Sequence, residues 1–305
     1  MREPLVVAIV VHYGDRPVGE VCLGPLGESQ GLTPRVVFVD NNPAASPAIA
    51  AEVRASGGTY LHYPSNPGFA GGFNGALHDA PLPSGVDMVV LLNSDVQPAP
   101  ECLTRLCAAF RSEPRLGVVG PGLLFAERRT VWWNRGSSLS WPEAKPSSLC
   151  HGEDRSGALD EDTDVLVDVD YVCGAAFAVR PELVNSVGVL DEDFFLYFED
   201  TDYCERVRQA GWRVAVLPAA LAWHEGGASF RHAAEEAVYY QVRNRLLFSQ
   251  RWNPYPLRGA YCRGKFIVAN LWRAARALTR GQGLESRARL AALRDYTLRR
   301  GGRRP

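Results

Sequence analysis

The chain has 305 residues, of which 46% are hydrophobic and 22% are charged, and its net charge is -1. This length and composition exclude wholesale disorder and allow one large domain or two small ones. The near-neutral total conceals an asymmetry: residues 258–305 hold 13 Lys and Arg against two acids, whereas residues 1–257 hold 20 basic and 32 acidic residues. We therefore expect the basic segment either to pack on the acidic body or to meet an anionic surface.

The cysteines and the hydrophobic runs indicate a cytoplasmic protein. None of the seven cysteines forms a CxxC pair, so neither a zinc site nor a redox pair is expected, and scattered thiols suit a reducing compartment. The first apolar run, residues 5–11, is short and rich in β-branched residues, which is typical of a buried strand and not of a signal peptide. No run approaches the about 18–20 apolar residues that a membrane span needs.

The order of apolar runs and turn residues predicts alternating strands and helices in the first half of the chain. Strands are expected at residues 5–11, 35–39, 59–63, 88–92 and 117–124, and helices at 67–78 and 100–111. A hairpin and a long loop are expected over 132–163, and strand-like sequence returns at 165–179 and 212–217. Short helices are expected at 181–187 and 200–210, and helices again from 233 to about 300, broken near 253–256 and 281–283.

This alternation predicts an α/β fold, in which a Rossmann-like and mostly parallel sheet carries flanking helices. We expect residues 1–252 to form this α/β domain and residues 253–305 to form a basic helical C-terminal extension. Ligands of such sheets bind outside the carboxyl ends of the strands. Side chains at those ends are therefore the first candidates for a functional site.

Two acids stand at predicted strand ends. Asp40 follows the strand at 35–39, and Asp95 closes the sequence Leu91-Leu92-Asn93-Ser94-Asp95. Asp40 can accept hydrogen bonds from a base or a ribose, and Asp95 can supply the oxygen ligand that a hard divalent cation prefers. Both could instead be ordinary turn residues.

A glycine-rich segment, NPGFAGGFNGA at residues 66–76, precedes a predicted helix. Glycine lets a backbone approach a ligand closely, so Asn66, Gly68, Gly71 and Asn74 are candidate ligand contacts. The segment lacks the GxxxxGK[ST] pattern of a P-loop and the GxGxxG pattern of a dinucleotide-binding first turn. A structural loop leading into a helix is the alternative.

Three carboxylates crowd the start of a predicted helix. They are Glu199, Asp200 and Asp202, and an aromatic run precedes them, so partial burial could raise one carboxyl pKa into the range of a general base. Acids at a helix N-terminus also stabilise the helix dipole, which is the structural alternative. Downstream, His224 is expected on a loop facing the site, where its imidazole can join Asp95 in a metal shell.

Taken in order, the segments VDNN, NPGFAGGFNGA, LLNSD, CGAA and FFLYFEDTDYCERVRQAGW resemble the family 2 glycosyltransferases of the GT-A fold. The resemblance covers about residues 5–250 and is closest to bacterial rhamnosyltransferase-like members. It implies an inverting transfer of a sugar from a nucleotide diphosphate sugar, a dTDP- or UDP-sugar, to a hydroxyl of a glycan, lipid-linked or small-molecule acceptor.

The resemblance also implies roles for individual residues. Asp40 matches the contact to the nucleotide base, and Asn93 lies in the donor-binding motif. Asp95 and His224 match the two positions that bind the divalent cation, Mg²⁺ or Mn²⁺. Asp200 matches the catalytic base, and Glu199 is its neighbour in the catalytic pair. The motif reads Asn93-Ser94-Asp95 where the family has Asp-X-Asp, so the choice of metal is left open.

Two other functions remain open at this stage. One is a scaffold or nucleotide-sugar-binding protein that has lost its chemistry, and the other is a nucleotidyltransferase. The segment His12-Tyr-Gly-Asp-Arg-Pro lacks the basic, glycine-rich loop that a nucleotidyltransferase would carry after its first strand. We expect the basic C-terminal helices to make peripheral contact with the inner face of the membrane, and we expect no nucleic-acid partner.

Overall fold

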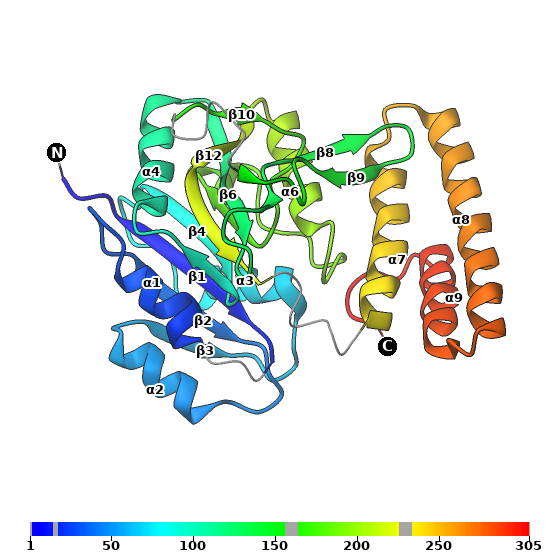
Figure 1. Ribbon diagram of the computed structural model, residues 1–305, viewed down its shortest axis with the longest axis horizontal. Helices are drawn as coiled ribbons and strands as arrows, with labels where there is room; N and C mark the ends of the chain where they lie inside the picture. Colours follow the sequence, from blue (N-terminus) through cyan, green and yellow to red (C-terminus); the bar gives the residue numbers. More distant parts are fainter. Residues whose placement is uncertain (1, 15–17, 156–163, 226–233, 305) are drawn as a thin grey trace.

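The computed structural model describes residues 2–14, 18–155, 164–225 and 234–304, and a ten-stranded sheet lies at its centre (Figure 1). The strands follow the order β10-β12-β6-β11-β4-β1-β2-β3. They span Val167–Asp168, Arg213–His224, Leu116–Phe125, Ala176–Val179, Met88–Asn93, Val6–His12, Arg35–Asp40 and Thr59–His62, respectively. Two short strands lie off this path: β5 (Val96–Pro98) pairs with β12, and β7 (Trp132–Asn134) pairs with β6.

Most of the sheet is parallel, which confirms the predicted fold class. Strands β3, β2, β1 and β4 run parallel to one another, and β6 and β12 run parallel to each other. Strand β11 lies antiparallel between β4 and β6. Of the strand-like stretch expected at residues 165–179, only the short strands β10 and β11 form, and a turn at Cys173–Ala176 separates them.

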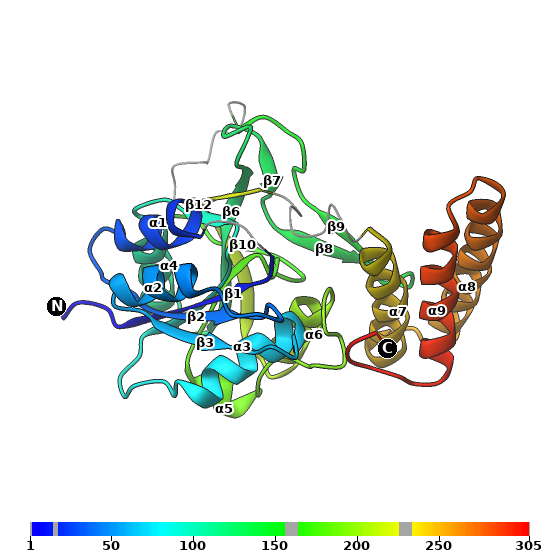
Figure 2. The same cartoon turned by 90° about the horizontal axis from the view of Figure 1, so that it is seen from below.

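Helices cover both faces of the sheet (Figure 2). Helices α1 (Gly24–Gly27), α2 (Pro47–Ala55) and α4 (Cys102–Ser112) cover one face, and α3 (Gly68–Asp79), α5 (Glu182–Ser186) and α6 (Glu199–Gln209) cover the other. In β1 the alternate side chains Val6, Ala8 and Val10 pack on the first face and Val7, Ile9 and Val11 pack on the second. Because both of its faces are buried, β1 reads as an unbroken apolar run.

The sequence prediction missed the helical segments between β1 and β3. Residues Gly19–Leu23 form a π-helical turn that leads into α1, and α2 follows β2. The start of α2 does carry a recognisable signal, since Ser46 accepts a hydrogen bond from the Ile49 amide at 3.3 Å and Pro47 stands at the first helical position. The segment before β2 is too short and irregular to show helical periodicity.

Three long helices follow the sheet and form a separate group at one side of the molecule (Figures 1 and 2). They are α7 (Ala234–Trp252), α8 (Pro256–Thr279) and α9 (Gly283–Thr297), and the breaks between them fall where the sequence predicts them. Helix α7 joins the two parts, because Phe248 lies in the core beneath the sheet whereas Tyr239 and Tyr240 pack with α9. The domain division at residues 252 and 253 stays a prediction.

A hairpin connects the sheet to this helical group. Strands β8 (Ser137–Ser140) and β9 (Lys145–Ser148) form it, as the sequence predicts, while residues 156–163 of the expected loop lie outside the described residues. Arg245 of α7 donates to the Glu143 carbonyl at 3.0 Å, and Asn253 donates to the Pro142 carbonyl at 2.6 Å. Within the described ranges, none of the helices is long and apolar enough to cross a membrane.

Candidate active site

A cavity of about 660 Å³ opens where the carboxyl ends of β4 and β12 meet α6, the β8–β9 hairpin and the helical group. Asn93, Asp95 and His224 line it from the sheet, and Glu199 and Asp200 line it from α6. A smaller hollow of about 100 Å³ shares Asn93 and Asp95 with the cavity. The cavity thus brings together three of the acids that the sequence singles out, Asp95, Glu199 and Asp200, with His224.

Asp95 and His224 are held side by side by the pairing of β5 with β12. His224 lies opposite Val96 in this pairing, and the Glu225 amide donates to the Asp95 carbonyl at 3.3 Å. The His224 Nε2 atom is 3.3 Å from Asp95 Oδ1, and both side chains are buried. His224 is the last residue of β12, so the prediction that it lies on a loop is wrong. The strand continues past residue 217 because a register shift after Leu217 lets it pair with β6 again.

These two side chains fit a divalent cation as part of its shell. A carboxylate oxygen and an imidazole nitrogen suit Mn²⁺, and His224 Nδ1 is buried without a hydrogen bond to any described residue. Across the described ranges, no three His, Cys, Asp or Glu side chains lie close enough together to bind a metal. A cation here would therefore need further ligands, such as oxygens of a diphosphate.

The two acids of α6 follow a strained loop. Phe195, Tyr197 and Phe198 have φ angles of 59°, 64° and 74°, a region that costs a residue with a Cβ atom about 1–2 kcal/mol. Such strain persists only where the surrounding structure enforces it, and it is common at functional sites. The loop at residues 193–198 thus delivers Glu199 and Asp200 to the cavity in a conformation that the local sequence would not adopt alone.

Hydrogen bonds fix the Asp200 carboxylate. Its Oδ2 accepts from the Gly174 amide at 2.7 Å, and its Oδ1 accepts from the Thr201 amide at 2.6 Å and the Thr201 hydroxyl at 3.0 Å. Burial raises the pKa of Asp200, and these hydrogen bonds partly oppose that rise. Burial raises the pKa of Glu199 well above its ordinary value, and the neighbouring Asp200 charge raises it further. Its Oε2 has no hydrogen bond within the described residues.

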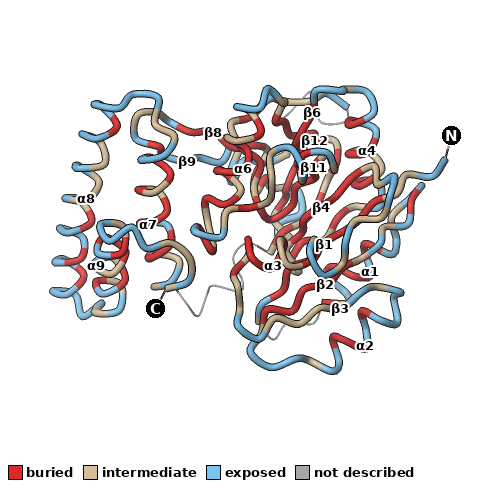
Figure 3. The backbone as a smooth tube through the Cα atoms, turned by 180° about the vertical axis from the view of Figure 1, so that it is seen from behind, coloured by how far each residue is buried: buried red, intermediate tan, exposed pale blue. Residues whose placement is uncertain are grey.

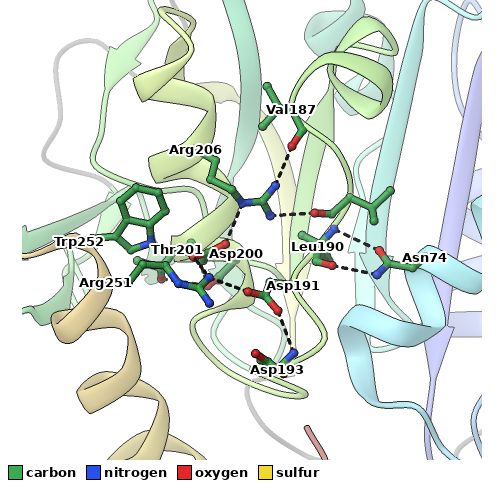
Figure 4. A network of polar contacts seen from close by, with 12 residues as sticks. Asn74, Val187, Leu190, Asp191, Asp193, Asp200, Thr201, Arg206, Arg251 and Trp252 are labelled. Atoms are coloured by element: carbon green, nitrogen blue, oxygen red, sulfur yellow. Dashed lines mark hydrogen bonds and ion pairs between the residues drawn. The ribbon is translucent and has the colours of Figure 1, made fainter. Parts of the chain in front are cut away.

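Asp202, the third acid of the cluster, is part of the framework. It is fully buried and accepts from Arg206 Nε at 2.9 Å, from an Arg251 terminal nitrogen at 2.9 Å and from Trp252 Nε1 at 2.8 Å. Figure 4 shows the arginines and Trp252 directed toward the start of α6. These contacts tie α6 to α7 and leave Asp202 outside the cavity lining.

Two buried polar residues of α7 hold the strained loop. Asn244 Nδ2 donates to the carbonyl oxygens of Phe194, Leu196 and Tyr197 at 2.7–2.8 Å. Arg243 donates to the Asp193 carbonyl at 2.8 Å and to the Asn244 side chain, also at 2.8 Å. We call these residues the Arg243–Asn244 pair. Both are fully buried, so the loop carbonyls have no water to replace these donors.

The end of the described chain joins the same arrangement. Arg243 also donates to the Gly302 carbonyl at 2.7 Å, and the Gly302 amide donates to the Asp193 carbonyl at 2.7 Å. The Arg304 amide donates to the Tyr240 hydroxyl at 2.9 Å. The segment after α9 therefore lies against the loop that precedes Glu199.

The other predicted donor residues have mixed surroundings. Asp40 is fully buried, accepts from the Tyr60 hydroxyl at 2.6 Å and from the Asn42 amide at 3.0 Å, and does not line the cavity. Asn66 and Gly68 line the small hollow beside Asp95. At Gly68, φ is +82° and a Cβ atom would lie 2.5 Å from the Phe195 ring, which explains the need for glycine.

The remaining two residues of the glycine-rich segment serve packing. Gly71 lies against Pro67, where an added Cβ would come within 2.6 Å of the proline Cβ. Asn74 donates to the Leu190 carbonyl at 2.9 Å and accepts from the Leu190 amide at 3.1 Å, away from the cavity (Figure 4). A direct donor contact by Asp40, Gly71 or Asn74 stays a prediction.

The structure adds residues that sequence reasoning missed. The Arg243–Asn244 pair holds the loop at residues 193–198, the Gly174 amide of the CGAA segment fixes Asp200, and the Trp133 ring packs edge-on against the His224 ring with 4.4 Å between their centres. The sequence signal for the Arg243–Asn244 pair was two polar residues within an otherwise apolar face of α7. Basic residues from the hairpin and the helical group also line the cavity: Lys145, Arg245, Arg273 and Arg289.

Comparison with solved structures identifies the fold as GT-A, the fold of a large class of glycosyltransferases. A mannosyltransferase from Pyrobaculum calidifontis, solved with GDP-Man and Mn²⁺, matches with a TM-score of 0.54 and 16% identity over 97% of this chain and 88% of its own. GalNAc-T7, solved with UDP, GalNAc and Mn²⁺, matches with a TM-score of 0.58 and 11% identity over 92% of this chain and 59% of its own.

The sequence comparison is more specific. The family described as "Glycosyltransferase like family 2" matches residues 33–245, so the chain belongs to this family and is a glycosyltransferase. N-acetylglucosaminyl-diphospho-decaprenol L-rhamnosyltransferase of Mycobacterium tuberculosis is 25% identical over 82% of this chain and 87% of its own length. Pre-mycofactocin glycosyltransferase of the same species is 30% identical over 59% of this chain and 35% of its own. The resemblance seen in the motifs is thereby confirmed.

Proposed function

We propose that the chain is an inverting glycosyltransferase that uses a divalent cation and moves a sugar from a nucleotide diphosphate sugar to an acceptor hydroxyl. The observation that carries this proposal is the single cavity that holds Asp95 and His224 at the sheet and Asp200 on α6. The first two side chains would hold the cation, Mg²⁺ or Mn²⁺. When bound, this cation supplies positive charge to the diphosphate leaving group.

Asp200 is the proposed base. Of the three clustered acids, Asp202 accepts hydrogen bonds from Arg206 and Arg251 and is therefore not free to act as a base. Glu199 is almost fully buried, whereas Asp200 is partly exposed to the cavity. The acceptor oxygen would bond to the anomeric carbon as its proton passes to the Asp200 carboxylate. The bond to the diphosphate oxygen would break on the opposite side, which inverts the anomeric centre.

A rhamnosyl donor is the finer form of this proposal. The M. tuberculosis relative is an L-rhamnosyltransferase, and it matches most of this chain and most of its own length. We therefore propose a dTDP- or UDP-linked sugar, with rhamnose as the first to test. The donor would contact Asn66, Gly68 and Asn93, which surround the small hollow beside Asp95.

The test is release of nucleoside diphosphate from a panel of nucleotide sugars, with and without Mn²⁺. We expect metal-dependent release that Asp200→Asn lowers by about 10²–10⁴-fold, the usual size of a general-base contribution. Both Asp200 oxygens accept backbone hydrogen bonds, so Asp200→Asn also disturbs the position of this side chain. Thr201→Ala is the control for such displacement, because it leaves the Asp200 carboxylate available as a base. Release of pyrophosphate would indicate a nucleotidyltransferase, and binding without release would indicate a scaffold.

We also propose that α8 rests on an anionic membrane from the cytoplasmic side. Leu257, Tyr261, Val268 and Trp272 are 88%, 68%, 65% and 59% exposed and repeat along one side of the helix, at the outer edge of the molecule (Figure 3). Such a face among basic residues suits a lipid surface. Co-sedimentation with anionic vesicles tests this, and we expect Trp272→Asp to weaken it. Equal sedimentation of mutant and wild type would contradict the proposal.

A further inference from the structure

The cavity that holds the proposed base is lined by acids from the sheet and α6 and by cations from the hairpin and the helical group, which lie apart in the fold (Figure 2). The acids are Asp95, Glu199 and Asp200. The cations are Lys145 of the β8–β9 hairpin, Arg245 of α7, Arg273 of α8 and Arg289 of α9. Four elements that are far apart in the sequence thus contribute one cation each to the same wall.

The positive charge of this wall is only partly neutralised. Arg289 donates to Glu285 at 2.8 Å and to Asn270 at 2.6 Å, so its charge is paired. Arg245 donates to the Glu143 backbone carbonyl, a neutral acceptor. The side chains of Lys145 and Arg273 have no hydrogen bond or salt bridge to any described residue. At least three cations therefore face the cavity without a carboxylate bonded to them.

Two of these cations act on each other. Burial lowers the pKa of Arg245, and the nearby Arg273 charge lowers it further, although Glu143 partly compensates. The Arg245 guanidinium also lies 4.4 Å from the centre of the Phe266 ring, which limits the directions it can take. Like charges gathered in a concave wall disfavour each other until an anion joins them. Guanidinium groups bind phosphate oxygens through paired hydrogen bonds, so a phosphate is the matching anion.

We propose that this basic wall binds a phosphate or diphosphate group of the acceptor. The inference rests on the proposed function and deepens it by naming the acceptor class. The donor diphosphate is expected at Asp95, beside the small hollow that Asn66 and Gly68 line, whereas the basic wall belongs to the hairpin and the helical group. A second anion at this wall would hold the acceptor with its hydroxyl toward Asp200.

The first experiment measures binding of inorganic pyrophosphate by calorimetry with EDTA present, so that no cation bridges it to Asp95. We expect Arg273→Gln to weaken binding about tenfold, the loss of one charge-assisted hydrogen bond. Arg276→Gln is the matched control, because Arg276 lies on the same helix over the Trp272 ring and does not line the cavity. Asn66→Ala, which changes the small hollow expected to hold the donor, should leave pyrophosphate binding unchanged.

Two results would overturn the proposal. Equal weakening by Arg273→Gln and Arg276→Gln would mean that only general charge attracts the anion. Equal weakening by Asn66→Ala and Arg273→Gln would place the pyrophosphate in the donor site. Release of nucleoside diphosphate from the donor alone is measured beside these. The control Arg276→Gln should leave this rate unchanged. A wild type that releases no nucleoside diphosphate would refute the proposed function and leave the binding result to stand by itself.

Discussion

The loop that carries Glu199 and Asp200 should depend on Asn244. The side-chain amide of Asn244 faces three buried carbonyl oxygens but has two hydrogens, so it supplies about two full hydrogen bonds. Leaving a buried acceptor unsatisfied costs about 1–3 kcal/mol, so Asn244→Ala should lower the free energy of unfolding by roughly 2–5 kcal/mol. The three positive φ angles cost a comparable amount, about 3–6 kcal/mol in total.

Because these two quantities nearly balance, the loop should relax once the amide is gone. We expect the kcat of Asn244→Ala to fall at least about tenfold, with less change in the KM for the donor, since Asp95 and His224 lie on other elements. Urea unfolding and steady-state nucleoside diphosphate release measure the two effects. Asn185→Ala removes an exposed amide on α5 and should change neither. If Asn244→Ala unfolds more easily yet keeps the wild-type kcat, the pair does not position the acids.

Three further outcomes follow from the site. Glu199→Gln should be more heat-stable than the wild type at pH 8, and the gap should shrink toward pH 5. Because the pKa of Glu199 is raised in the folded protein, its contribution to stability is present only while the carboxyl is protonated and is lost as the pH rises through that pKa. A difference in melting temperature between Glu199→Gln and the wild type that does not vary with pH would contradict this prediction. Asp95→Ala should abolish the enhancement by Mn²⁺ of the affinity for nucleoside diphosphate. The loss should be at least the roughly 10–100-fold that changes beyond the direct metal ligands cost, and His224→Ala should lower the enhancement less. An undiminished enhancement in Asp95→Ala would exclude Asp95 as a ligand. Asp202→Asn should lower the free energy of unfolding by roughly 2–4 kcal/mol in urea titrations because Arg206 and Arg251 lose their shared partner, and an unchanged midpoint would argue against a structural role.

Features of the fold that depend on local periodicity could be predicted from the sequence. The apolar runs of β1, β2 and β4 are continuous because both faces are covered, and their ends place Asp40 and Asp95 at one edge of the sheet. The extension of β12 to His224 could not be seen in this way. It depends on pairing with β6 and β5 across a register shift, and such pairing leaves no local pattern.

The site was predictable in its residue types but not in its distribution of roles. The sequence alone does not distinguish the three acids at the start of α6, Glu199, Asp200 and Asp202. Only the contacts of Asp202 with Arg251 and Trp252, which the structure shows, separate it from the other two. The basic wall was equally hidden, because its members come from four elements. In the sequence, Arg273 and Arg289 appear only as part of a general excess of positive charge after residue 257, and Lys145 and Arg245 lie before that segment.

The hydrogen bond between the Gly302 amide and the Asp193 carbonyl has a consequence for folding during synthesis. During synthesis the sheet strands and α6 emerge long before residue 302, so the sheet can fold while the loop before Glu199 still lacks its last contacts. A nascent chain would then pass through a stage in which the edge of the sheet with Asp95 is formed but the loop at residues 193–198 is poorly held. Transfer activity should arise only after the segment beyond α9 has left the ribosome and closed against the loop.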